Sequence, residues 1–165
     1  MRFSQDERFL AAVTGPRETE LTVLVWDVVS GKELVGFQPH RVWLGVLDFS
    51  PDGTVLATVS FDNTCKLFVL RRRQEIATLR GHRSSLWSVC FSPDGRRLAV
   101  GAGDGDIIIW DLETHREVLV LKTPSRPAIR FHPSGDSLLF CSGSTLHLWR
   151  APSWAEIDAA ERPGR

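Results

Sequence analysis

The sequence predicts an all-β domain built from repeated antiparallel units, and three recurring features predict it. Residues 49–53, Phe-Ser-Pro-Asp-Gly, return at 91–95 and, in weaker form, at 131–135. An aromatic residue recurs at Trp26, Phe68, Trp110 and Trp149, and a histidine recurs at His40 and His82. Successive members of each series lie 39 to 42 residues apart. A fixed period of this length is the signature of a repeat architecture.

Each unit contains four short stretches in which apolar and polar residues alternate. In the best-preserved unit and the start of the next, the stretches are residues 55–60, 65–70, 74–79 and 86–91. Alternation with period two is typical of strands, and the Pro-Asp-Gly strings between them are typical of tight turns. Each unit is therefore expected to be a four-stranded antiparallel meander. Such a sheet cannot bury both faces alone, so we expect the units to stack on one another.

The composition excludes several classes of protein. Of 165 residues, 42% are hydrophobic and 24% charged, and the formal net charge is zero, as in a globular domain rather than a disordered one. No apolar stretch approaches the roughly 20 residues of a membrane span, and residues 1–7 lack the apolar core of a signal peptide. A neutral balance does not favour nucleic acid or an anionic membrane as a partner. We expect a cytoplasmic protein.

The three cysteines fit a reducing compartment. Cys65, Cys90 and Cys141 are odd in number, form no CxxC pair and lie within apolar runs. Each is therefore expected to be a small buried side chain rather than a reactive thiol.

The repeat unit resembles the WD-repeat β-propeller family. The resemblance rests on Gly81-His82, on residues 91–95, on Trp110-Asp111 and on Trp26-Asp27, and it covers roughly residues 3–150. It implies radially arranged blades of four antiparallel strands around a central channel. About four blades, half a propeller, are expected over residues 1–40 (incomplete), 41–82, 83–124 and 125–150 (incomplete), with 14 strands in all. Residues 151–165 carry a capping box and predict a short C-terminal helix and tail, similar to the ends of bacterial WD-repeat proteins.

The resemblance also implies a buried hydrogen-bond chain in each blade. Its members are a His before the inner strand, a Ser or Thr of the second strand, an Asp of the following turn and the Trp of the third strand. The residues that match are His40, Ser60 and Asp62 in the second unit, and His82, Asp104 and Trp110 in the third. Neither set is complete, because Phe68 replaces the Trp in the second unit and Ala102 replaces the hydroxyl residue in the third.

No motif of an enzyme is present. The sequence has no GxxxxGK[ST], HExxH or GxSxG string, and no two of its five histidines have the local spacing of metal ligands. We therefore expect no catalytic residues, no metal site and no cofactor.

Partner binding is the remaining function class, and the fold implied by the resemblance gives it a place. One flat end of such a domain is formed by two kinds of loop. One kind joins the outer strand of a blade to the inner strand of the next, and the other joins the second and third strands of a blade. Exposed Trp and Arg side chains are enriched in binding hot spots. The candidate residues for a protein or peptide partner are Arg41, Trp43, Phe61, Arg83, Ser85, Trp87 and Arg126.

Two hypotheses follow. The first is a non-catalytic scaffold for protein–protein interaction, the C-terminal sensing or docking part of a larger bacterial signalling protein. The second is a half-propeller that self-assembles into a closed eight-bladed homodimer with no further ligand, because four blades do not close a ring. The location of Arg41, Trp43 and Arg83, either in a dimer seam or on an exposed face, discriminates between them.

Overall fold

The computed structural model describes residues 1–15 and 21–150, which form fifteen strands in four antiparallel sheets and contain no helix. The all-β prediction is confirmed, with three or four strands in each sheet. The predicted C-terminal helix falls on residues 151–165, outside the described residues.

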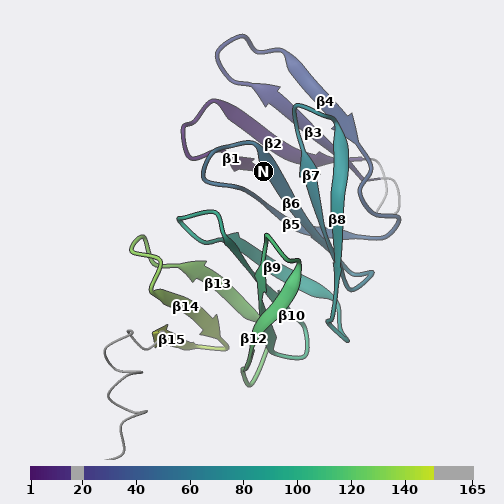
Figure 1. The fold of residues 1–165 in the computed structure, drawn as a ribbon. Coiled ribbons are helices and arrows are strands. Elements are labelled where there is room, and N and C mark those ends of the chain that lie inside the picture. Colours follow the sequence, from purple (N-terminus) through teal and green to yellow (C-terminus); the bar gives the residue numbers. More distant parts are fainter. Residues whose placement is uncertain (16–20, 151–165) are drawn as a thin grey trace, which may run out of the picture.

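The four sheets follow the chain in order (Figure 1). The first contains β1 (Arg2–Phe3), β2 (Phe9–Thr14), β3 (Thr22–Asp27) and β4 (Glu33–Phe37). The second contains β5 (Leu44–Phe49), β6 (Val55–Ser60), β7 (Thr64–Val69) and β8 (Gln74–Arg80). The third contains β9 (Leu86–Phe91), β10 (Arg97–Ala102), β11 (Asp106–Asp111) and β12 (Arg116–Lys122). The last contains β13 (Pro127–Phe131), β14 (Ser137–Ser142) and β15 (Thr145–Arg150).

The count of fourteen strands was too low, because the described residues alone form fifteen. The chain begins with β1, a strand of two residues that pairs with β2 through Arg2 opposite Ala11 and Phe3 opposite Leu10. Its shortness left no alternating pattern to read in the sequence. The first sheet therefore has four strands, and within residues 1–15 and 21–150 only the last sheet has three.

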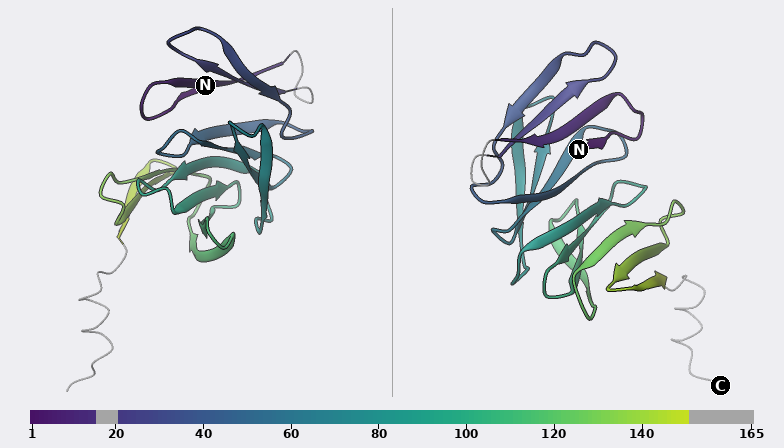
Figure 2. Two further views of the ribbon diagram at one scale, coloured as in Figure 1. Left: turned by 45° about the horizontal axis from the view of Figure 1, so that its top comes forward. Right: turned by 180° about the vertical axis from the view of Figure 1, so that it is seen from behind.

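Every sheet is a meander, so each strand pairs with its neighbours in sequence. The first strands of consecutive sheets lie side by side, and the sheets are stacked one behind another (Figure 2). We refer to β1, β5, β9 and β13 as the inner strands and to each sheet as a blade.

The repeated Ser-Pro-Asp-Gly string forms the turn between the first two strands of a blade. Ser50 Oγ donates to Asp52 Oδ1 at 2.6 Å and accepts from the Val55 backbone N–H at 2.9 Å. Gly53 adopts a φ of 68°, which a residue with a side chain rarely adopts. Ser92, Asp94 and Gly95 repeat this arrangement in the next blade.

Apolar side chains from facing blades fill the space between them. Leu98 and Trp110 of the third blade, for example, pack against Ala57 and Leu67 of the second. Similar clusters join the first blade to the second and the third to the fourth. Stacking therefore gives each interior blade two buried faces, as the repeat pattern predicts.

The first and last blades each have one face that no described residue of a further blade covers. Register places Phe3, Leu10 and Trp26 on the free face of the first blade. It places Leu139, Cys141, Leu146 and Leu148 on the free face of the last. Leu146 and Leu148 are both 64% exposed, and Phe3 is 52% exposed.

Candidate functional site

Four of the predicted partner-binding residues come together where the inner strands begin. The ring centroid of Phe61 lies 4.3 Å from that of Trp43 and 4.6 Å from that of Trp87, and the two indoles are 5.5 Å apart. The Arg126 guanidinium lies 3.9 Å above the Trp87 ring. We call Trp43, Phe61, Trp87 and Arg126 the rim cluster. Its members come from the second, third and fourth blades.

Backbone contacts hold the second-blade part of the rim cluster in place. The Trp43 carbonyl accepts the Phe61 N–H at 3.0 Å and the Ser60 hydroxyl at 2.7 Å. Gly45 allows the Trp43 ring to fold over the strand, because a Cβ at this position would lie 2.8 Å from that ring. Two aromatic rings distant in sequence are thus fixed side by side.

The rim cluster is partly accessible. Trp43, Phe61 and Trp87 are half-buried, whereas Arg126 is exposed and forms no ion pair among the described residues. The rings pack on one another and still present area to solvent. A rigid aromatic surface with an unpaired guanidinium is the kind of surface on which binding hot spots occur.

The structure does not bring the other three candidates into this cluster. Arg41 is exposed in the segment before Trp43. The Ser85 carbonyl accepts the Gly103 N–H at 2.8 Å. Arg83 lines a separate cavity of about 520 Å³ together with Asp104 and other charged side chains.

The second blade contains a buried hydrogen-bond network around His40, whose side chain is fully buried. His40 Nδ1 lies 2.9 Å from Asp62 Oδ2, and His40 Nε2 lies 3.0 Å from Thr58 Oγ1. The carboxylate can only accept, so Nδ1–H donates to Asp62 and the Thr58 hydroxyl donates to Nε2. Thr64 Oγ1 donates to the other carboxylate oxygen of Asp62 at 2.6 Å.

This network corrects the sequence expectation at one residue. The hydroxyl that reaches His40 belongs to Thr58 and not to Ser60, which instead donates to the Trp43 carbonyl. Both residues lie on β6 two positions apart and so face the same side of the strand. Burial lowers the pKa of His40, and hydrogen bonds from Thr64 and His40 lower the pKa of Asp62 against the opposing effect of its burial.

The third blade does not form the corresponding network. His82 Nδ1, His82 Nε2 and Trp110 Nε1 are buried and have no hydrogen-bond partner. Asp104 accepts the Asp106 N–H, and Asp106 pairs with Lys122. Burial lowers the pKa of His82 to about 4, more than the nearby carboxylates of Asp104 and Asp106 raise it.

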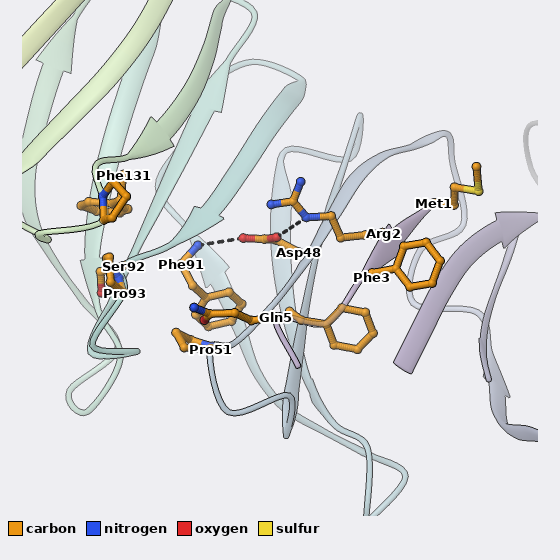
Figure 3. Close-up of a pocket in the computed structure, with 12 residues that line it drawn as sticks. Met1, Arg2, Phe3, Gln5, Asp48, Pro51, Phe91, Ser92, Pro93 and Phe131 are labelled. Atoms are coloured by element: carbon orange, nitrogen blue, oxygen red, sulfur yellow. Dashed lines mark hydrogen bonds and ion pairs between the residues drawn. The ribbon is translucent and has the colours of Figure 1, made fainter. Parts of the chain in front are cut away.

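A larger cavity, of about 660 Å³, lies at the opposite ends of the inner strands (Figure 3). Asp48 lies beside it, where its carboxylate accepts Arg2 Nε–H at 2.8 Å and the Phe91 N–H at 3.0 Å. Asp48 thus ties the inner strands of three blades together. The Arg2 and Asp48 side chains at this cavity are paired with each other, and this marks a structural contact rather than a free binding group.

The cysteines differ from one another. Burial raises the pKa of the Cys65 thiol well above its usual value and that of Cys90 to about 12, so neither is a nucleophile at neutral pH. The expectation of a buried thiol was wrong for Cys141, which is exposed on the free face of the last blade.

The described residues contain no group of His, Cys, Asp and Glu side chains that could hold a metal ion. Nor do they contain a helix with the length and apolar character of a membrane span.

Comparison with known proteins agrees with the stacked four-stranded blades. The family model described as WD domain, G-beta repeat matches residues 31–68 and 73–111. These ranges include most of the second and third blades. No curated protein matches the chain significantly. The chain thus contains two recognisable WD repeats in succession, which supports its assignment to the WD-repeat family.

Proposed function

We propose that this chain is a non-catalytic scaffold that binds a protein partner through the rim cluster. WD repeats generally mediate protein–protein interaction. The observation that carries the proposal is the packing of three half-buried aromatic rings on one another, with the Arg126 guanidinium over the Trp87 ring. This guanidinium has no ion-pair partner among the described residues.

The rim cluster suits this role because it is formed before any partner arrives. Hydrogen bonds to the Trp43 carbonyl and close ring packing already restrict its side chains. Binding therefore orders few rotamers, and less of the interaction free energy is lost to conformational entropy.

The test uses the full chain, immobilised, to select peptides from a random display library. Affinities of the selected peptides are then measured by fluorescence anisotropy for Trp43→Ala, Trp87→Ala and the control Phe3→Ala. Loss of a hot-spot residue costs about 2 kcal/mol or more, so the two Trp variants are expected to bind at least tenfold more weakly. Circular dichroism verifies that each variant is folded. Unchanged affinity in both Trp variants would refute the rim cluster as the site.

We also propose the setting expected from the sequence: the cytoplasm of a bacterium, as the docking or sensing part of a larger signalling protein. Its support is the resemblance of residues 151–165 to the ends of bacterial WD-repeat proteins and the neutral composition. Cell fractionation of the source organism, with immunodetection of this chain and its native size, tests it. Recovery in the membrane or secreted fraction would contradict it.

A second candidate function, self-assembly into an eight-bladed homodimer, is favoured by the two free faces. Leu10 and Trp26 pair in the first blade as Leu98 and Trp110 pair in the third. Leu98 and Trp110 pack on the second blade through residues that include Leu67.

The free face of the last blade resembles the face of the second blade on which Leu98 and Trp110 pack. Leu148 pairs with Leu139 there, as Leu67 pairs with Ala57 in the second blade. The free faces therefore repeat the two sides of an interface that is already present inside the chain. In a dimer, the last blade of each copy would pack on the first blade of the other. This would bury both free faces of each copy and close a ring with twofold symmetry.

Light scattering coupled to size exclusion tests the second candidate. The ring predicts a mass of about 37 kDa, twice the 18.5 kDa of one chain. Leu148→Asp is expected to give a monomer, because it places a charge in the apolar seam. Val29→Asp, at an exposed turn position, is the control and is expected to leave the mass unchanged. A wild-type mass of 18.5 kDa would exclude the homodimer, and polydisperse aggregates would point to a different cover for these faces.

A further inference from the structure

A groove of about 360 Å³ lies beside Trp87 and continues the surface of the rim cluster. Its wall is largely apolar and includes Val46 of the second blade, with Ala128 and Leu146 on the free face of the last blade and Arg130 as its one charged residue. A ligand in this groove and a second copy packed on that free face therefore exclude each other. No carboxylate lines it. Val46, Trp87 and Ala128 come from the inner-strand segments of three successive blades.

Two arginines lie along this surface and have no carboxylate partner in the described part of the chain. Arg126 directly precedes β13 and Arg130 lies within it, so the two alternate onto the same side of the strand. Their Cα atoms are separated by about 13 Å at the rise of an extended strand. Neither guanidinium forms an ion pair within residues 1–15 and 21–150.

The position of Arg126 favours carboxylates as its ligands. Its guanidinium is stacked on Trp87, and stacking fixes the plane of the group and leaves its N–H edge available for a bidentate contact. A carboxylate that meets it at the apolar wall is partly desolvated, and the attraction is then stronger than in water. Two arginines in a chain of zero net charge are too few for a nucleic acid, whose binding needs a wider basic surface.

We infer that the rim cluster and this groove bind an acidic, apolar peptide segment in extended conformation. Its carboxylates meet Arg126 and Arg130, and an apolar side chain between them packs on Trp87, Ala128 and Val46. This inference rests on the proposed function, because it names the chemistry of the partner for the same site.

The library selection described above tests the inference through the composition of the peptides. Peptides selected on the wild-type chain are expected to be enriched in Asp or Glu about four residues apart, with Leu, Phe or Trp between them. Arg126→Glu and Arg130→Glu are expected to weaken these peptides about tenfold each, because each loses a charge-assisted hydrogen bond. Selection on the charge-reversed chains is expected to enrich Lys or Arg instead.

The control is Arg72→Glu, which reverses an exposed arginine in the turn between β7 and β8. Its expected affinity is that of the wild type. A change equal to that of Arg126→Glu would show that only overall charge matters and would overturn the inference.

The outcomes separate this inference from the proposed function. Selected peptides without acidic enrichment that still lose affinity in Trp87→Ala would overturn the acidic partner and keep the rim cluster as a site. Acidic peptides weakened by Arg130→Glu but insensitive to Trp43→Ala and Trp87→Ala would overturn both the rim cluster and the inferred packing of the peptide on Trp87. Absence of any selected peptide would overturn both.

Discussion

The second and third blades each have a histidine at the same place in the repeat, but the hydrogen bonding of the two histidines differs. His40 is fully buried and bonded at both ring nitrogens, to Asp62 and to Thr58. His82, 42 residues later, has both ring nitrogens buried and unpartnered. The strands around the two histidines are otherwise alike, since each blade has four strands with a register shift between the third and the fourth.

One missing hydroxyl accounts for the difference at Nε2, the ring nitrogen that Thr58 contacts in the second blade. Val100 occupies in β10 the place that Thr58 occupies in β6, so the third blade has no hydroxyl at this place to donate to the histidine. The apolar packing between blades is complete in both cases. Stacked apolar faces are therefore sufficient to form a blade, and the polar network adds stability without determining the fold.

The largest expected difference between the blades comes from replacing each histidine by leucine. His40→Leu leaves the Thr58 hydroxyl buried without a partner and is expected to cost about 2 kcal/mol in the free energy of unfolding. His82→Leu removes two unpaired nitrogens and is expected to leave that free energy unchanged or raised by up to about 1 kcal/mol. Urea unfolding of both variants and the wild type measures the difference. Equal losses in the two variants would show that His82 has a partner in solution.

Acid stability is expected to depend on His82 through its lowered pKa. The unfolded chain binds a proton at this histidine below about pH 6.5, whereas the folded chain binds one only near pH 4. Protonation of His82 therefore does not affect the free energy of unfolding above pH 6.5. It lowers this free energy as the pH drops toward 4, by at most about 1.4 kcal/mol for each pH unit.

Comparison with His82→Leu isolates this effect, because the contributions of His40 and of the aspartates are common to both proteins. The difference in unfolding free energy between the wild type and the variant should change across pH 6.5 to 4. Two parallel curves in urea unfolding over this range would contradict the assignment.

A smaller effect is expected when the second blade is made to resemble the third. Thr58→Val removes one hydroxyl at nearly constant shape and is expected to cost about 1–2 kcal/mol. The loss should disappear in a His40→Leu background, since the histidine is then no longer there to accept the bond. Ser60→Ala is the matched control: its hydroxyl serves the Trp43 carbonyl, so its cost should be the same in both backgrounds. If Thr58→Val costs as much in the His40→Leu background, the Thr58 hydroxyl does not stabilise the fold through its bond to His40.

Repeat spacing was sufficient to predict the stacked antiparallel blades, and the resemblance to the WD-repeat family placed His40 and Asp62 in one network. It could not choose between Thr58 and Ser60, because both project to the same side of β6 and only three-dimensional distance decides which one reaches the ring. The fold implied by the same resemblance placed Trp43, Phe61, Trp87 and Arg126 at one end of the blades. Their contact with one another depends on how the Trp43 ring turns over Gly45, which no periodic pattern encodes.

Cys141 shows a different limit of sequence reasoning. Its apolar neighbours predict burial, and in an interior blade the corresponding side chain is covered by the next blade. Cys141 lies opposite Ala128 and Leu146 on the free face of the last blade, and it is exposed there. Burial of a repeat residue is decided by the adjoining repeat, and local sequence carries no information about that neighbour.

The smallest effect is expected when a hydroxyl is introduced into the third blade at the position of Thr58 in the second. This change is also the most direct test of why the two blades differ. Val100→Thr places a donor where Thr58 lies in the second blade, and it is expected to raise the free energy of unfolding by about 0.5–1.5 kcal/mol. The same change in a His82→Leu background should lower it, because a buried hydroxyl without an acceptor costs about 1–3 kcal/mol. A hydroxyl that donates to the ring favours neutral His82, so an NMR titration should find its pKa still depressed. Stabilisation in both backgrounds would mean that the hydroxyl acts without His82, and that the two blades differ for a reason other than this one bond.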